Sequence, residues 1–336
     1  MSREGPLSER DQNLDPLRVV YLGSGAFGLP TLKHLCQQHD VAAVVTQPDR
    51  PAGRKRRMTP TQVAVWAQDA GLSVIKSGDV NCQDVVDRIS QTDADAAVVV
   101  AFGQKLGPSV IAALGRLVVN LHGSLLPRYR GAAPVNWAVI NGEDETGVSV
   151  ISLAEQMDAG QVYAQATTTI SPMSTAGELH ECLASLGPQT IEQVLTQFKA
   201  GTLKGVQQDD SLASRAPKLS RADGWVDFHA DALTIQRRIH GLAPWPGVKV
   251  IWRRASGEEN ELALLRVDAE PGHSHDAEPG TILPGNLVAV GAPGDQGAVR
   301  LLEIQPPGKR AMTIRQFAAG HSIKPGDSLT SLIAPP

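Results

Sequence analysis

The chain has 336 residues, of which 42% are hydrophobic, and a formal net charge of −4 at pH 7. That length fits two domains rather than one, and the composition is typical of a globular protein with a sizeable core. The slight negative charge excludes a uniformly basic nucleic-acid-binding protein but leaves room for a local basic patch. No apolar run approaches the ~20 residues needed to cross a bilayer, which excludes a membrane-spanning helix.

The first sixteen residues, MSREGPLSERDQNLDP, contain no apolar core and carry four acids. A signal peptide needs an apolar core and a transit peptide is poor in acids, so residues 1–16 predict a disordered tail on a cytoplasmic protein. The three cysteines (Cys36, Cys82 and Cys182) are far apart and form no C-x-x-C pair. We expect them to be buried as small apolar residues, with neither a disulfide framework nor a metal site.

The first domain, residues 17–203, alternates short β-branched runs with stretches of helical spacing. Strands are expected at residues 18–22, 41–46, 96–101 and 118–121, and helices at 30–38, 61–70, 81–91, 108–114, 133–141 and 175–198. Runs such as AAVVVA suit strands that are buried on both faces, which predicts an α/β domain with a Rossmann-like, mostly parallel sheet. Residues 147–153 and 161–170 are close enough in sequence to pair as an antiparallel hairpin at the sheet edge.

The character of the sequence changes after residue 203. Residues 204–219 are polar and contain Gly, Ser and Pro, which predicts a linker. A helix at 232–241 then precedes short strands that are divided by Gly and Pro. This spacing predicts a small β-barrel or sandwich as the second domain, over residues 220–336.

A glycine motif, Gly23-x-Gly25-x-x-Gly28, follows the first strand with the spacing of a dinucleotide-binding fingerprint. A dinucleotide site also needs an acid near the tip of the second strand, ~20 residues further on. The tip of that strand is Thr46 or Gln47 instead. We therefore interpret the glycines as a tight turn from strand to helix and expect no NAD.

A second motif, VVNLHG, places Asn120 and His122 two residues apart on a strand, so they point to the same face. Gly123 indicates that the strand ends there, at the carboxyl edge of the sheet where open α/β folds bind ligands. An amide that donates to a developing oxyanion and an imidazole that moves a proton suit acyl transfer without a covalent intermediate. The spacing alone leaves open that both are satisfied turn residues.

The stretch NLHGSLLPRYRGAAP, with the downstream MDAGQV, resembles the formyltransferases that use 10-formyltetrahydrofolate. Three separated motifs match in the right order: the Asn-x-His pair, the Ser-Leu-Leu-Pro loop and an Asp in a later D-x-G turn. The resemblance implies that Asn120, His122 and Asp158 form the catalytic group and leaves open which of the last two accepts the proton. The folate contacts that it implies are Ser124, Leu125, Leu126 and Pro127, together with Phe102 and Gly103 of the segment AFGQKLGP.

The densest positive cluster of the chain lies in the loop TQPDRPAGRKRRMTP and comprises Arg50, Arg54, Lys55, Arg56 and Arg57. A basic run is usually a solvated loop, but one beside a catalytic edge also suits the binding of phosphates. The part TQPDRPAGR resembles the insertion of methionyl-tRNA formyltransferases that contacts the acceptor stem. That resemblance implies binding of methionyl initiator tRNA by these five cations, with Arg54 as the arginine after "AG" that matters in the family.

The second domain resembles the OB-like C-terminal barrel of the same family in APKLSRADGWVDF, IHGLAPWPGVKVIW and LLEIQPPGKRAM. Altogether the resemblance covers about residues 18–326 and implies an enzyme of translation initiation; we expect a monomer. From Arg215 onward there are 14 Lys and Arg against 13 Asp and Glu, so a tRNA-facing surface requires that the charges are sorted. Candidates for such a face are Lys249, Arg253, Arg254, Lys309 and Arg310.

Several alternatives remain at this level. A sugar-nucleotide N-formyltransferase carries the same core but has no need of the basic loop. A formyltetrahydrofolate hydrolase fused to a dehydrogenase would be much longer, and the intact Asn120, His122 and Asp158 set disfavours an inactive RNA-binding module. The missing acid at the second strand disfavours a nicotinamide-dependent oxidoreductase.

Overall fold

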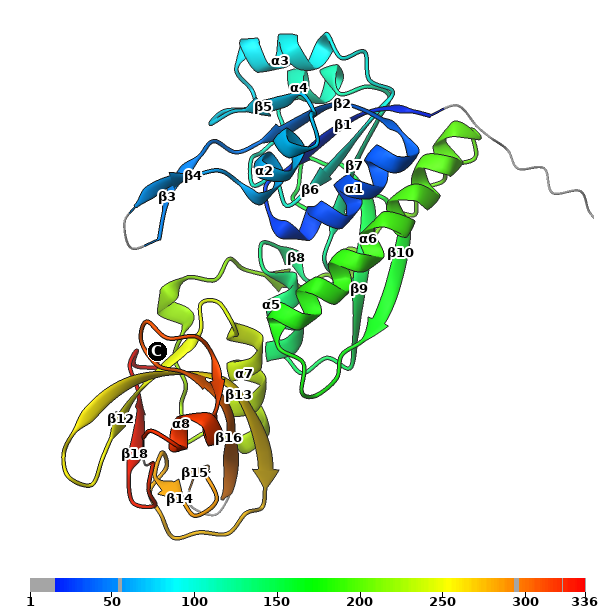
Figure 1. Ribbon diagram of the computed structural model, residues 1–336. Coiled ribbons are helices and arrows are strands. Elements are labelled where there is room, and N and C mark those ends of the chain that lie inside the picture. Colours follow the sequence, from blue (N-terminus) through cyan, green and yellow to red (C-terminus); the bar gives the residue numbers. More distant parts are fainter. Residues whose placement is uncertain (1–15, 54–55, 293–295, 322, 336) are drawn as a thin grey trace, which may run out of the picture. The chain divides into compact units, whose positions relative to one another are not determined.

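A computed structural model describes residues 16–53, 56–292, 296–321 and 323–335 (Figure 1). The chain divides into two compact units. Unit 1 comprises Met1–Asn120 and Ile191–Lys204, and unit 2 comprises Leu121–Thr190 and Gly205–Pro336. The expected tail at residues 1–16 lies outside the described residues except for Pro16, which is exposed. No helix among the described residues is long and apolar enough to cross a membrane.

Unit 1 is built on parallel strands, as the apolar runs predict. Its strands are β1 (Arg18–Gly23), β2 (Asp40–Thr46), β5 (Val74–Lys76), β6 (Ala96–Val100) and most of β7 (Leu117–His122). The strand β1 pairs in parallel with β2 and β6, and β2 pairs in parallel with β5. The complete sheet has the order β10-β9-β7-β6-β1-β2-β5. The short strand β5 has no counterpart in the sequence prediction, because three residues are too few to show a periodicity.

The helices of unit 1 are α1 (Leu29–Gln38), α2 (Gln62–Asp69), α3 (Gln83–Ser90) and α4 (Pro108–Ala113). Val85 of α3 and Val110 of α4 pack against Val20, Val45 and Val99, which share one face of the sheet. Alternate residues of the same strands point to the opposite face and are buried as well. Burial on both faces explains why these strands read as continuous apolar runs rather than as alternating ones.

Unit 2 begins at the end of β7 and contains the antiparallel hairpin of β9 (Glu145–Ser152) and β10 (Val162–Thr169), with β10 at the sheet edge as predicted. Helices α5 (Pro134–Ile140) and α6 (Ala176–Lys199) also match their predicted positions, and α6 continues into unit 1. Helix α5 packs on α7 (Ala232–Leu242). Contact is close where Gly241 lies, since a Cβ there would be 2.9 Å from the Ile140 backbone nitrogen.

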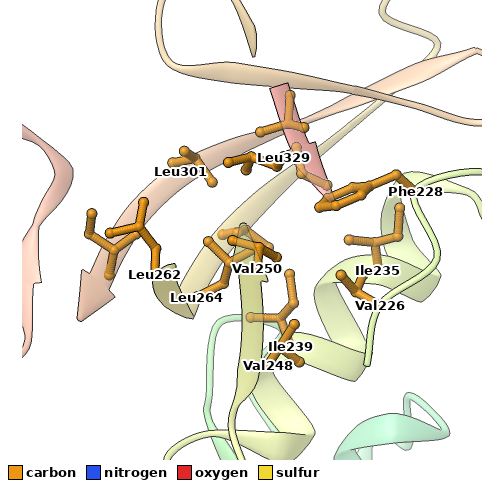
Figure 2. Close-up of a cluster of buried hydrophobic side chains, with 14 of the residues drawn as sticks. Val226, Phe228, Ile235, Ile239, Val248, Val250, Leu262, Leu264, Leu301 and Leu329 are labelled. Carbon is orange, nitrogen blue, oxygen red and sulfur yellow. The ribbon is translucent and has the colours of Figure 1, made fainter. Parts of the chain in front are cut away.

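The C-terminal part of unit 2 is an antiparallel barrel with the strand order β14-β15-β16-β13-β12-β18, as the resemblance implies. The strands are β12 (Val248–Arg253), β13 (Glu259–Pro271), β14 (Ile282–Leu283), β15 (Leu287–Val290), β16 (Gly297–Gln305), β17 (Met312–Thr313) and β18 (Ser328–Ser331). A bridge between Thr281 and Ser328 brings the two ends of this order together. Figure 2 shows the barrel core, where Ile235 and Ile239 of α7 pack against Val250 and Leu264. The short helix α8 (Ile314–Ala318) adds Phe317 to this core.

The segment 204–219, expected as a linker, is folded against the rest of unit 2. It contains a 3-10 turn at Asp210–Leu212, and its strand β11 (Arg215–Ala216) pairs with β8 (Arg130–Gly131). The cysteine prediction is wrong in part, because Cys82 and Cys182 are exposed; all three cysteines are free. Cys82 directly precedes α3 and Cys182 lies on α6, and an exposed thiol at such a position leaves no trace in the spacing of the residues around it.

Candidate active site

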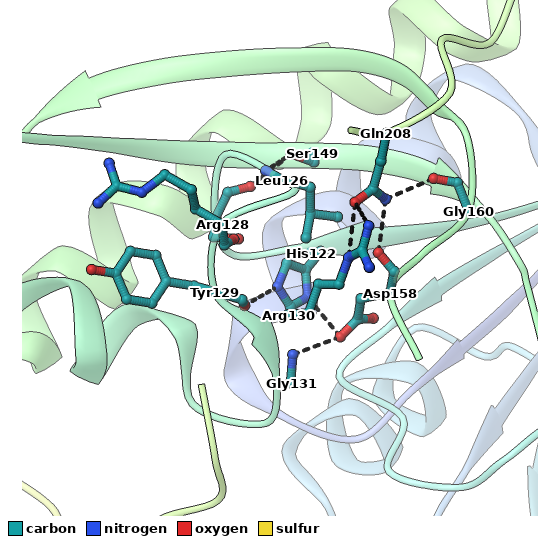
Figure 3. A network of polar contacts seen from close by, with 11 residues as sticks. His122, Leu126, Arg128, Tyr129, Arg130, Gly131, Ser149, Asp158, Gly160 and Gln208 are labelled. Carbon is teal, nitrogen blue, oxygen red and sulfur yellow. Dashed lines mark hydrogen bonds and ion pairs between the residues drawn. The ribbon is translucent and has the colours of Figure 1, made fainter. Parts of the chain in front are cut away.

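His122 is the last residue of β7, and its ring is fixed by one backbone carbonyl. Its Nε2 lies 2.9 Å from the Tyr129 carbonyl oxygen, and its side chain is 7% exposed (Figure 3). A carbonyl oxygen only accepts, so Nε2 carries a proton and donates it to this bond. Any further proton that the ring takes up must therefore be held on Nδ1.

Nδ1 of His122 faces Asp158, which the resemblance assigns to the same catalytic group. The nitrogen lies 3.6 Å from Asp158 Oδ2, and the Asp158 side chain is 13% exposed. The same Oδ2 accepts the Gly131 backbone N–H at 2.9 Å. A separation of 3.6 Å is too long for a hydrogen bond but suits an ion pair, so the carboxylate stabilises a proton that arrives on Nδ1.

Asp158 lies in the turn between β9 and β10 with a left-handed backbone, at φ = 56°. Aspartate tolerates this conformation better than most residues. Two positions later, a Cβ on Gly160 would lie 1.8 Å from the Ser152 carbonyl oxygen. Glycine is thus required at this position for the tight return of the chain, which explains the D-x-G pattern.

The third predicted catalytic residue, Asn120, belongs to unit 1. It lies two residues before His122 on β7, so both side chains point to the same face of this strand. Asn120 is half-buried, and within the described part of the chain its amide has no hydrogen-bond partner. The amide is therefore available to a substrate oxygen.

The predicted folate loop is held firmly by its own contacts in unit 2. Ser124 Oγ donates to the Arg128 carbonyl at 2.7 Å, and Ser149 Oγ donates to the Ser124 carbonyl at 2.7 Å. The Leu126 N–H in turn donates to Ser149 Oγ at 3.0 Å. Leu125 and Pro127 are half-buried. These two therefore have the more accessible side chains of the four.

The other two predicted folate residues follow β6 in unit 1. Phe102 is 3% exposed and packs into the core, whereas Gly103 is exposed with φ = 80°. The Phe102 carbonyl accepts from the side chains of Gln47 and Ser24, at 3.0 and 3.4 Å. Contact of this segment with folate stays a prediction, and the Phe102 ring is buried while Gly103 is exposed.

The glycine motif makes room for a side chain of the protein itself. A Cβ on Gly28 would lie 1.8 Å from Tyr21 Oη, and one on Gly23 would lie 2.6 Å from the same atom. Tyr21 is fully buried, and its hydroxyl has no hydrogen-bond partner. Burial strongly raises the pKa of this hydroxyl. At the tip of β2, Thr46 is buried and its hydroxyl lies 2.8 Å from Thr61 Oγ1.

The basic segment forms a two-stranded hairpin rather than an irregular loop. Strands β3 (Arg50–Ala52) and β4 (Arg57–Thr59) pair antiparallel and extend away from the rest of unit 1 (Figure 1). Arg50, Arg56 and Arg57 are exposed, while the predicted Arg54 and Lys55 lie outside the described residues. In this part of the chain the structure gives Arg50 one side-chain partner, Gln47.

Most of the predicted cationic face of the barrel is neutralised locally. Lys249, Arg253 and Arg254 form ion pairs with Glu261, Glu259 and Glu258, each at 2.7 Å. The other two candidates, Lys309 and Arg310, are exposed, and so are Arg215, Lys218 and Arg221 in the segment before the barrel. None of these last five has an acidic partner among the described residues.

The site also depends on residues that the sequence analysis did not single out. These are Tyr129 through its carbonyl, Gly131 through its N–H, and the pair Arg130 and Gln208. Gln208 Nε2 donates to the carbonyls of Asp158 and Gly160, at 2.8 and 2.7 Å. Backbone contacts carry no residue-type signal, and Gln208 lies in a polar stretch that predicts only a linker. Within the described ranges, no group of three or more His, Cys, Asp and Glu could hold a metal ion.

Comparison with known proteins assigns the class. The formyl transferase family model matches residues 17–195, and the model of the formyl transferase C-terminal domain matches residues 218–322. The fold and these matches define a formyl-transferring enzyme. The chain is 36% identical over 316 residues to the methionyl-tRNA formyltransferase of Geobacter metallireducens, covering 92% of this chain and 97% of the relative. It is 38% identical over 317 residues to that of Nitratidesulfovibrio vulgaris, covering 91% and 93%. The chain therefore belongs to the methionyl-tRNA formyltransferase family.

Solved structures share the fold at low sequence identity. The N-formyltransferase of Helicobacter canadensis, in complex with folinic acid and dTDP-3-aminofucose, gives a TM-score of 0.60 at 13% identity, with 85% of this chain and 99% of that chain covered. HypX of Aquifex aeolicus, in complex with tetrahydrofolic acid, gives 0.58 at 16% identity, with 90% and 47% covered. These likenesses show the fold alone.

Proposed function

We propose that the protein transfers the formyl group of 10-formyltetrahydrofolate to the α-amino group of methionyl initiator tRNA, as a cytoplasmic monomer that serves translation initiation. The observation that carries the chemistry is the His122–Asp158 pair, in which Nε2 is committed to a carbonyl and Nδ1 faces a carboxylate at 3.6 Å. The relatives' names support the acceptor.

The reaction begins with the α-amine, whose ordinary pKa near 8 leaves part of it neutral at pH 7. Its nitrogen attacks the formyl carbon and gives a tetrahedral intermediate that bears an oxyanion. The Asn120 amide donates to this oxygen, a type of contact typically worth ~3 kcal/mol. The intermediate collapses by breaking the bond between the formyl carbon and N10 of the folate.

Protons move in the opposite sense to the formyl group. The attacking nitrogen loses a proton, and N10 gains one as it leaves. His122 Nδ1, stabilised by Asp158, holds the proton between these two events, either directly or through water. The loop of Ser124, Leu125, Leu126 and Pro127 and the backbone at Phe102 and Gly103 would hold the folate.

The acceptor is inferred from charge. The hairpin β3–β4 carries Arg50, Arg56 and Arg57 on exposed positions, and an extended basic hairpin suits a nucleic-acid backbone. An amino-sugar nucleotide has one pyrophosphate and gives no reason for this hairpin.

The test offers a labelled formyl group on 10-formyltetrahydrofolate separately to methionyl-tRNA and to an amino-sugar nucleotide. We expect labelled tRNA and a rate that falls steeply with added salt. Labelling of the sugar nucleotide alone would retain the site chemistry and overturn the acceptor. Labelling of neither, with intact protein, would overturn the proposed function.

A further inference from the structure

The carboxamide of Gln208 connects Arg130 to the turn that carries Asp158 (Figure 3). Gln208 is 7% exposed and lies in the segment that neither family model matches. Its Oε1 accepts from Arg130 Nε at 3.0 Å and from Arg130 Nη2 at 2.8 Å. Its Nε2 donates to the carbonyls of Asp158 and Gly160. All four hydrogen-bonding positions of the carboxamide are thus used.

Only glutamine supplies this combination at this length. A guanidinium can only donate and a backbone carbonyl can only accept, so the group between them needs an acceptor and two donors. A carboxylate satisfies Arg130 but opposes the two carbonyls, whereas an apolar side chain satisfies neither. The partners also settle the orientation of the amide, with its oxygen toward Arg130.

The two carbonyls belong to a turn that needs support. Asp158 has a positive φ, and the chain at Gly160 runs so close to Ser152 that a Cβ on Gly160 would lie 1.8 Å from the Ser152 carbonyl oxygen. A residue in this region of backbone space persists only where its surroundings fix it. Gln208 binds the carbonyls on both sides of Ala159 and so fixes the backbone from which the Asp158 carboxylate projects.

Arg130 directly follows Tyr129, whose carbonyl binds His122, and Arg130 is fixed by contacts of its own. It is 8% exposed, and its N–H donates to the Ser214 carbonyl at 2.9 Å. Its guanidinium also pairs with Asp210 at 2.7 Å, but that carboxylate is largely exposed. A series of contacts from Arg130 through Gln208 to Asp158 therefore links the Tyr129 carbonyl to the Asp158 carboxylate. These are the two groups that contact the His122 ring.

We propose that Gln208 is a positioning residue of the reaction, which sets the distance between the Asp158 carboxylate and His122 Nδ1. This inference rests on the proposed role of Asp158 in formyl transfer. Gln208 does not touch the reacting atoms. It acts through the carbonyls of the turn.

The first test compares Gln208→Glu with Gln208→Met in the full-length protein. Gln208→Glu keeps and strengthens the contact with Arg130 but removes both donors to the turn. Misplacement of a catalytic group by about 1 Å costs on the order of 100-fold in rate, so we expect kcat to fall roughly 100-fold in both variants, with KM for both substrates retained. Full activity of Gln208→Glu would show that only the Arg130 contact matters and would overturn the proposal. Asp210→Asn is the matched control, and its kcat should stay near that of the wild type.

The second test does not depend on turnover. The Gly131 N–H reports on the Asp158 carboxylate through its 2.9 Å hydrogen bond to Oδ2. In Gln208→Glu we expect an upfield shift of the Gly131 amide proton and faster hydrogen exchange, and in Asp210→Asn neither. An unchanged Gly131 amide in Gln208→Glu would overturn the positioning role.

A double-mutant cycle separates this inference from the proposed function. If Gln208 acts through Asp158, Gln208→Glu should cost far less in an Asp158→Asn background than in the wild type. Equal costs in both backgrounds would overturn the inference and leave the catalytic role of Asp158 intact. Full activity of Asp158→Asn alone would instead overturn the proposed site, whatever Gln208 does to the turn.

Discussion

Gly28 has an ordinary helical backbone, at φ = −86°, so its conformation does not require glycine. The requirement comes from Tyr21, whose hydroxyl occupies the volume where a Cβ would lie. A motif that in other proteins lets a pyrophosphate approach the backbone here admits a tyrosine side chain. The same spacing of glycines therefore serves two different purposes, and the neighbouring residues decide which.

Because a Cβ on Gly28 would clash with the Tyr21 hydroxyl, we predict that Gly28→Ala destabilises the protein by about 1–3 kcal/mol, the usual cost of overpacking a core. Tyr21→Phe removes the nearest atom, and because that hydroxyl is buried without a partner its loss should be neutral or stabilising. We expect the double variant to recover most of the stability lost by Gly28→Ala. Denaturant unfolding of the four proteins measures this, and strictly additive effects would contradict the account.

Asn120 is the single residue whose role is cleanest to test. Asn120→Ala should lower kcat by roughly 100-fold, equivalent to ~3 kcal/mol, with little change in KM, since the oxyanion exists only in the transition state and intermediate. Asn260→Ala, an exposed asparagine of β13, is the control. A variant at position 120 with wild-type turnover would remove Asn120 from the catalytic group.

At the scale of elements, the hairpin β3–β4 and the segment 204–219 show opposite outcomes of similar sequence signals. Both are polar and lie between stronger elements. The hairpin carries exposed cations, whereas the segment folds onto β8 through β11 and onto the Asp158 turn through Gln208. Composition alone does not distinguish a solvated hairpin from a segment that is anchored to the fold by a short strand and one buried glutamine.

For the basic segment we predict that Arg54→Ala raises the KM for methionyl-tRNA. The slope of log KM against log salt concentration should decrease by about 1. Slow transfer to a small amine analogue should be unaffected. The comparison is with Arg88→Ala, which removes an exposed arginine from α3. Equal losses with tRNA and with the small amine would place Arg54 in the support of the active site instead.

At the scale of the whole molecule, each unit carries a group that makes folding sensitive to acid. In unit 2, His240 is fully buried and its Nε2 accepts the Val267 N–H at 3.1 Å. Burial, with the nearby charge of Arg266, lowers the pKa of this imidazole from its ordinary 6.5. In unit 1, hydrogen bonds from His39 and His34 lower the pKa of Glu192 from 4.5 to about 2.

Both pKa values are lower in the folded protein than in the unfolded protein, so the unfolded protein binds protons more readily. The free energy of unfolding therefore decreases as the pH is lowered. The contribution of neutral His240 to the free energy of unfolding is complete above pH 6.5 and is lost as the pH falls below that value. The contribution of Glu192 is complete above pH 4.5 and is lost between pH 4.5 and about 2. Lowering the pH should therefore decrease the free energy of unfolding in two successive pH ranges.

We expect His240→Gln, which keeps an acceptor for Val267, to flatten the pH dependence of unfolding in the upper window only. Glu192→Gln should flatten it in the lower window only. Denaturant unfolding at a series of pH values measures both slopes. An unchanged upper slope in His240→Gln would show that another group governs the loss of stability below pH 6.5.

The sequence by itself determined the parallel sheet, the edge hairpin and a second domain of short strands, because apolar patterning and turn residues report directly on burial and chain reversal; the choice of a barrel over a sandwich came from the family resemblance. It also suggested Asn120, His122 and Asp158 as the catalytic group, through the family resemblance rather than through spacing alone, and that assignment stays a prediction. Only the tertiary structure decided that Tyr21 explains the glycine motif, that three cations of the barrel pair with nearby acids, and that Gln208 holds the Asp158 turn. The contact of Gln208 with Asp158 joins residues 50 positions apart in the sequence. Where the partners are near in sequence, as with Arg254 and Glu258 or Tyr21 and Gly28, the folded backbone decides where each side chain points, and the order of residues alone does not.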